Sequence, residues 1–267
     1  MRSRPDLLNA YGLGFLVFLY APVLLLPLFS FNDNTFAVFP LRGFTLQAYR
    51  DLAQNDSLLH ALRNSLMVGT SVSVFSTVLG MLAAMAATRY RLPGRAPVMG
   101  VIMLPLVVPS IILAVALLIV VRQVFDVPLT LWTVGAGHVL LCLPFSMLVL
   151  MSRLEGFDKS LEEAASDLGE NGWMTFWRVT FPLALPGIVS SLLMTFTVSF
   201  DEYVIAFFLS GIDQTLPIFL YSQLRFPDRL PMTLALGSCI LFASTLIVVA
   251  SELLRRRGVK SSRPTGL

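Results

Sequence analysis

The sequence predicts an all-α membrane protein, a bundle of six spanning helices. Of its 267 residues, 56% are hydrophobic and 13% are charged, and the mean hydropathy is +0.78. A soluble domain carries about twice that charged fraction. The hydrophobic residues also occur in long uninterrupted blocks, and a helix needs about 20 of them to cross a bilayer. These observations together favour a polytopic membrane protein over a soluble globular one.

Six blocks are long enough to cross the bilayer, and each predicts one helix. They cover residues 13–31, 66–87, 98–121, 131–151, 183–200 and 232–254. The first block is long for a signal peptide and no small-residue cleavage site follows it, so we expect it to be retained as a span. Together the blocks predict a single transmembrane domain over residues 1–267, with core spans over about 64–254.

Prolines interrupt several of these blocks. Membrane helices tolerate proline where neighbouring groups satisfy the freed carbonyls. We therefore expect kinks, and no breaks, at the following positions: Pro22, Pro27, Pro105, Pro109, Pro144 and Pro186.

The basic residues predict the orientation. The formal net charge of +3 comes from Lys and Arg residues between the apolar blocks, so it indicates membrane topology and no nucleic-acid partner. Thirteen of the 19 fall on the side that holds both termini, led by the cluster Arg89, Arg91 and Arg95 and by the run 255–257. The richer side faces the cytoplasm. Both termini are therefore expected to be cytoplasmic.

A long loop over residues 152–182 precedes the fifth span on the predicted cytoplasmic side. Leu161, Ala164, Ala165 and Leu168 share one face of a short helix at i, i+3, i+4 and i+7, while Glu162, Glu163, Ser166 and Asp167 form a solvated acidic face. Ser160 and Glu163 have the spacing of a capping box. Gly169 and Gly172 predict a reversal. A second short helix is expected to start after Asn171 and to end at Pro182.

This loop resembles the EAA loop of binding-protein-dependent ABC importer permeases. The matching residues are Glu163-Ala164-Ala165, then Gly169, and Val179-Thr180-Phe181-Pro182, at the family's spacing. Val179 and Phe181 replace the usual Ile and Leu. The resemblance implies a type I (MetI-like) core in the last five spans and a coupling helix that docks on a separate ATPase subunit. The coupling residues that it implies are Glu163, Ala164, Ala165, Asp167, Leu168 and Gly169.

The same resemblance implies the partners and the location of the chain. They are a second, homologous permease subunit, two ATP-binding subunits and an extracytoplasmic solute-binding protein, assembled in a bacterial inner membrane. The sequence contains no G-x4-G-K-[ST] motif for nucleotide phosphates. We therefore expect no cofactor in this chain, with ATP and Mg on the partner, no catalytic residue and no enzymatic activity of its own.

Three further stretches resemble the second permease subunit of spermidine/putrescine importers. They are residues 55–59, residues 153–158, and residues 200–205 followed by Leu216-Pro217. The last of them includes Asp201 and Glu202 at the predicted outer end of the fifth span. Carboxylates at that depth are costly and mark candidate sites. They are also suited to attract an amine cation, with Phe200, Tyr203 and Tyr221 as cation–π neighbours. Alternatively, the span ends there and both carboxylates face water.

Several alternatives stay open at this point. The same machine could carry an opine, an amino acid, an organophosphonate or an iron complex. A membrane enzyme or a secondary transporter would need catalytic or charged residues inside the spans, where His138 is the single histidine. A lone histidine there is typical of a packed, hydrogen-bonded group. Cys142 and Cys239 lie inside apolar blocks, so no disulfide and no metal site is expected.

Overall fold

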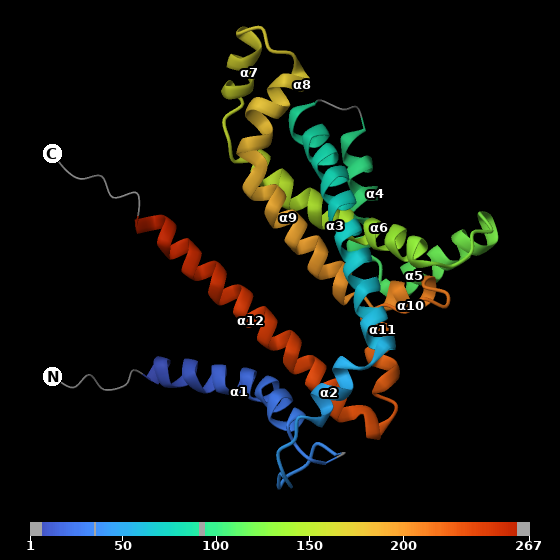
Figure 1. Cartoon of the computed structure of the whole chain (residues 1–267). Coiled ribbons are helices and arrows are strands. Elements are labelled where there is room, and N and C mark those ends of the chain that lie inside the picture. Colours follow the sequence, from blue (N-terminus) through green and yellow to red (C-terminus); the bar gives the residue numbers. More distant parts are fainter. Residues whose placement is uncertain (1–6, 35, 91–93, 261–267) are drawn as a thin grey trace, which may run out of the picture. The chain divides into compact units, whose positions relative to one another are not determined.

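The structure is a computed structural model that describes residues 7–34, 36–90 and 94–260, and side chains between residues 9 and 246 within these ranges. All its regular elements are helices (Figure 1). In chain order they are α1 (Leu7–Ser30), α2 (Gln47–Ala53), α3 (Asp56–Arg89), α4 (Arg95–Val107), α5 (Ser110–Ile119), η1 (Val120–Val124), α6 (Leu131–Glu155), α7 (Ser160–Asp167), α8 (Gly172–Thr175), η2 (Phe176–Thr180), α9 (Phe181–Asp201), α10 (Val204–Leu209), α11 (Leu216–Gln223), η3 (Pro227–Arg229) and α12 (Leu230–Lys260).

Within the described residues, five helices are long and apolar enough to cross a membrane, and six if a bent pair is counted as one span. The bent pair, Arg95–Val107 and Ser110–Val124, turns by 108°. The prediction of an unbroken third span, merely kinked at Pro109, is therefore wrong. Val108 is extended, with φ −76° and ψ 127°. The ring of Pro109 disfavours the helical conformation for the residue before it, which ends α4 there.

The other prolines of the apolar blocks stay inside helices. Pro22 and Pro27 lie within α1, Pro105 within α4, Pro144 within α6 and Pro186 within α9. The all-α class and the apolar spans are thus confirmed.

The chain forms two compact units, and the first of them combines both chain ends, Met1–Asp56 and Leu220–Leu267. Within it α12 packs against α1 and α2. Ser30 and Tyr49 share a hydrogen bond of 2.7 Å between their hydroxyl oxygens. The apolar side chains of α1, such as Leu13 and Phe18, are mostly exposed, as expected for a helix that faces lipid. That residues 1–267 act as one transmembrane domain stays a prediction.

The second unit runs from Ser57 to Phe219 and holds the central helix packing. A seam of small polar residues joins α3, α6 and α9. The Ser191 hydroxyl lies 3.0 Å from the Thr77 hydroxyl and 2.7 Å from that of Ser146. At Gly80 a Cβ atom would lie 2.1 Å from Ser146 Oγ, so only glycine fits. Small residues and interhelical hydrogen bonds are the typical means of packing helices within a membrane.

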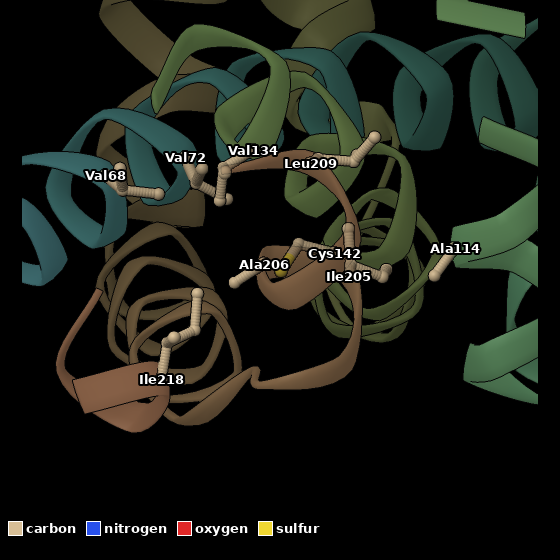
Figure 2. Close-up of a cluster of buried hydrophobic side chains, with 9 residues drawn as sticks. All are labelled: Val68, Val72, Ala114, Val134, Cys142, Ile205, Ala206, Leu209 and Ile218. Atoms are coloured by element: carbon tan, nitrogen blue, oxygen red, sulfur yellow. The ribbon is translucent and has the colours of Figure 1, made fainter. Parts of the chain in front are cut away.

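A buried apolar cluster lies beside this seam (Figure 2). Val68 and Val72 of α3 contribute to it with Val134 and Cys142 of α6. The short helices α5, α10 and α11 contribute the rest: Ala114, Ile205, Ala206, Leu209 and Ile218. The cluster fixes α10 against α5 and α6, and so places the chain that follows α9.

Several basic residues that predict the orientation lie outside the described residues. They are Arg2, Arg4, Arg91 and Arg263. Only the backbone is described for the run 255–257 and for Lys260.

Candidate functional site

The loop between α6 and α9 folds as two short helices, α7 and α8, at the same end of the unit as the C-terminus of α3 (Figure 1). Helix α7 ends in a glycine turn. Gly169 has φ +89°, its N–H donates to Ser166 O at 3.0 Å, and the next N–H, of Glu170, donates to Ala165 O at 3.0 Å. These are the two hydrogen bonds of a Schellman motif, in which the left-handed residue is usually glycine. The predicted reversal at Gly169 is confirmed.

The start of α7 differs from the prediction. Ser160 is already the first helical residue, and no side-chain cap bond is made at the N-cap position, Lys159. Instead, the Ser160 N–H donates to Asp158 Oδ1 at 3.0 Å. This bond and a side-chain bond with Ser160 lower the pKa of the Asp158 carboxyl. The capping box of Ser160 and Glu163 is therefore wrong, and the carboxylate two residues before Ser160 satisfies its N–H.

The faces of α7 also differ from the prediction. Ala165 is buried, but Leu161 is 47% and Leu168 87% exposed, and Ala164 is exposed as well. Glu162, assigned to the solvated acidic face, turns inward. It lies three residues before Ala165, so the two share a face of the helix. The predicted apolar stripe is thus exposed except at Ala165.

Glu162 makes two contacts beyond its own helix. Its Oε2 atom lies 2.8 Å from Arg89 Nε at the end of α3, and its Oε1 atom accepts a 2.7 Å hydrogen bond from the Thr180 hydroxyl. The neighbouring Glu163 is exposed, as are Ser166 and Asp167. Sequence reasoning missed these contacts because it treated Arg89 only as a topology marker and Thr180 only as part of a motif.

Helix α8 starts as predicted, with the Asn171 side chain accepting a hydrogen bond from the Met174 N–H at 2.9 Å. It does not end at Pro182. A π-helical turn, η2, carries it into α9, and residues 172–201 form one candidate span. The Phe181 N–H makes the last bond of this π turn, to Phe176 O, and Pro182, which lacks an N–H, follows where the α-helical pattern resumes.

A cavity of about 440 Å³ lies between α7, α8 and the end of α3. Charged groups of both signs line it. Its lining includes Arg89, Lys159, Glu162, Glu163, Asp167 and Thr180. Four of the predicted coupling residues, Ala164, Ala165, Leu168 and Gly169, are absent from that lining. The loop therefore has an inner, charged side and an outer side with exposed apolar residues.

The two carboxylates at the far end of α9 also differ from each other. Helix α9 ends at Asp201, which is exposed. Glu202 is extended and half-buried, and its Oε1 atom accepts hydrogen bonds from the N–H groups of Val204 at 2.9 Å and Ile205 at 3.1 Å. Glu202 thus caps α10. The structure therefore presents only Asp201 of this pair openly to solvent.

The predicted aromatic neighbours form separate pairs. Phe200 stacks on Phe196 with ring centroids 5.6 Å apart, and Tyr203 contacts Phe207 at 5.6 Å. Tyr221 is exposed and belongs to the first unit, so the structure does not place it in the predicted group.

His138 is a packed histidine of the bundle, as predicted. Its side chain is 1% exposed, and Nδ1 lies 2.9 Å from the Ser199 hydroxyl of α9. Among the described residues no group of three or more His, Cys, Asp or Glu side chains could hold a metal ion.

Comparisons with known proteins agree with this architecture. Residues 76–259 match the family "Binding-protein-dependent transport system inner membrane component". The chain is 34% identical to the spermidine/putrescine transport system permease protein PotC of Escherichia coli, over 92% of each protein. It is also 34% identical to the putrescine transport system permease protein PotI of the same species, over 93% of this chain and 90% of that protein.

Solved structures share the fold at low identity. A bacterial ABC transporter involved in the import of alginate aligns with a TM-score of 0.72 at 18% identity, covering 96% of this chain and 98% of that chain. The methionine ABC transporter MetNI aligns with a TM-score of 0.55, also at 18% identity, covering 78% of this chain and 99% of that one. The fold is therefore that of ABC importer permeases. With the family match over most of its length, this chain belongs to the family of inner membrane components of binding-protein-dependent transport systems.

Proposed function

We propose that this chain is one permease subunit of an ATP-driven importer for polyamines such as spermidine and putrescine. The observation that carries the proposal is the 34% identity, over 92% of each chain, to a spermidine/putrescine permease. Membership of a binding-protein-dependent transport family sets aside the membrane-enzyme and secondary-transporter alternatives. Importers for another small solute remain the alternative to be tested.

In this proposal the outer side of α7 docks on an ATP-binding subunit. Leu161, Ala164 and Leu168 are exposed apolar residues on a short helix, with the carboxylates of Glu163 and Asp167 beside them. Apolar residues with charges at their rim are typical of a protein interface. The positive φ of Gly169 holds the turn that ends this helix.

The assembly would contain a second permease subunit, two ATP-binding subunits and an extracytoplasmic solute-binding protein. This chain would have both termini in the cytoplasm and would bind neither ATP nor Mg itself. ATP would close the ATP-binding subunits, move the loop of residues 152–182 and open the path outward.

Asp201 is the side chain best placed to attract the cationic solute. It is exposed at the end of a span, where an unpaired carboxylate favours cations. Glu202 would contribute its charge while its Oε1 atom caps α10. Phe200 and Tyr203 stay candidate neighbours.

The test is uptake of labelled spermidine and putrescine by the source cell, with the chain present, absent, or carrying Gly169→Asp. Loss of uptake in both altered cells is the expected result. A side chain at φ +89° strains the turn that ends α7, and the added carboxylate brings a further negative charge to the proposed docking side. Competition with unlabelled amino acids, opines, organophosphonates and iron complexes tests the alternatives. Unchanged polyamine uptake in the deletion would overturn the choice of solute.

A further inference from the structure

Glu162 joins three segments that are distant in the sequence. The side chain belongs to α7, its ion-pair partner Arg89 ends α3, and its hydrogen-bond partner Thr180 lies in the turn that leads into α9. Both oxygens of the carboxylate are used. The side chains of Arg89 and Glu162 are 9% and 19% exposed, so the pair is largely shielded from water.

Arg89 in turn contacts the end of α6. Its Nη2 group donates to the carbonyl of Leu154 at 3.3 Å, and its guanidinium lies 4.8 Å from the centre of the Phe157 ring. Lys159, just before α7, donates to the carbonyl of Thr88 at 3.1 Å. Helix α7 is therefore tied through side chains to α3, and through Arg89 to α6.

A second contact links the loop to η2, the turn that leads into α9. Glu170, just after the Gly169 turn, forms an ion pair with Arg178. The side chain of Arg178 is 64% exposed, so this pair is screened by solvent and contributes little. The shielded pair at Glu162 is different, because removing one partner leaves the other charge buried and unpaired.

We propose that Glu162, with Arg89 and Thr180, forms the connection through which movement of α7 reaches α3 and α9. This rests on the proposed coupling of α7 to an ATP-binding subunit. The exposed side of α7 would receive the movement, and the inward Glu162 would pass it to both spans. Glu162 is thus a positioning residue that lies outside the motif residues 163–169.

The first test is Glu162→Gln in the complete importer, reconstituted in lipid vesicles. The amide keeps an oxygen for Thr180 but presents no negative charge to Arg89. We expect assembled complex and ATP hydrolysis to persist, because Arg89 keeps its contacts with the Leu154 carbonyl and the Phe157 ring. Spermidine uptake per ATP should fall by roughly tenfold, the size of a typical coupling between sites. The matched control is Glu155→Gln, the same change at an exposed carboxylate that ends α6, which should leave the ratio unaltered.

The second test removes the other contact. Thr180→Val deletes the hydroxyl at nearly constant volume and should lower uptake per ATP, while Thr180→Ser keeps the hydroxyl and should preserve it. If Glu162→Gln and Thr180→Val reduce only the amount of assembled complex, or leave uptake per ATP unchanged, the proposal is overturned.

Gly169→Asp separates this proposal from the one on which it rests. If Gly169→Asp blocks uptake and Glu162→Gln does not, the loop couples transport but Glu162 is not its connection. If Gly169→Asp also leaves uptake intact, the coupling role of the loop itself is wrong.

Discussion

Two pairs of adjacent carboxylates lie near opposite ends of the span formed by α8, η2 and α9. Glu162 and Glu163 precede it in α7, and Asp201 and Glu202 lie at its end. In each pair one carboxylate is exposed, Glu163 in one case and Asp201 in the other. The inward members differ. Glu162 bonds to residues 73 positions before it and 18 after it, whereas Glu202 bonds to backbone N–H groups two and three residues away. The loop end is thus held by long-range side-chain contacts, and the Asp201 end by local ones.

The difference suggests different consequences of mutation. A local cap stabilises one short helix, so its loss should destabilise that helix alone. A long-range bond links helices, so its loss uncouples them while each stays folded.

The largest expected difference concerns two glycines with positive φ. At Gly211 φ is +64°, and a Cβ atom would lie 2.4 Å from the backbone oxygen of Leu129. At Gly169 φ is +89°, with nothing within 4 Å of the Cβ position. We expect Gly211→Ala to cost about 3 kcal/mol, from strain and overlap together. Gly169→Ala, with strain alone, should cost about 1 kcal/mol. Thermal unfolding of the purified complexes compares them, and equal losses would contradict the packing at Leu129.

The next prediction tests the exposed carboxylate at the end of α9. Asp201→Asn removes one charge and should lower spermidine uptake at limiting solute by about fivefold, the effect of one unit charge at close range in water. Uptake at saturating solute should change less. Asp213→Asn, in the loop after α10, is the matched control. Equal effects of the two changes would exclude a specific role for Asp201.

Glu202 should behave as a helix cap. Glu202→Ala removes the acceptor for the N–H groups of Val204 and Ile205 and should cost about 1 kcal/mol. Glu202→Gln keeps an acceptor oxygen and should cost less. Hydrogen exchange of α10 amides measures the difference. If Glu202→Ala exchanges as slowly as the unaltered chain, the cap contributes nothing.

Much of the spans and of the loop was predictable. Long apolar runs determine spanning helices because the bilayer admits few other structures, and Gly169 was predictable because few residues adopt its φ. The break at Val108-Pro109 was not, because a proline in an apolar run fits both a kinked helix and a broken one. The continuation of the helix past Pro182 was not predictable either, because the π turn that joins α8 to α9 leaves no sequence signal.

Glu162 and Glu163 could not be told apart from sequence. Both are glutamates in the same helical turn, and their roles are decided by where Arg89 and Thr180 lie in space. The capping error has a similar cause, since Asp158, Ser160 and Glu163 all have suitable side chains. The position of Arg89, directly after an apolar block, is the sequence signal that could have pointed to a partner on the loop.

The smallest expected effect concerns Asp158. Its pKa is lowered by the bond from the Ser160 N–H, so its contribution to stability is fully present above the ordinary pKa of 3.8 and is lost as the pH falls through the lowered value. At neutral pH, Asp158→Ala removes the acceptor of the Ser160 N–H and should speed hydrogen exchange in the first turn of α7 while leaving α8 unchanged. If exchange in the first turn of α7 is the same in the variant and in the unaltered chain, the cap at Asp158 is contradicted.

The most direct test is spermidine uptake into vesicles that hold the complete importer. The solute-binding protein is added on the side of the membrane from which solute is taken up, and ATP is supplied on the opposite side. The account predicts uptake that requires ATP, the binding protein and this chain together, and that Gly169→Asp abolishes. Uptake that persists without ATP, or in vesicles that lack this chain, would contradict it.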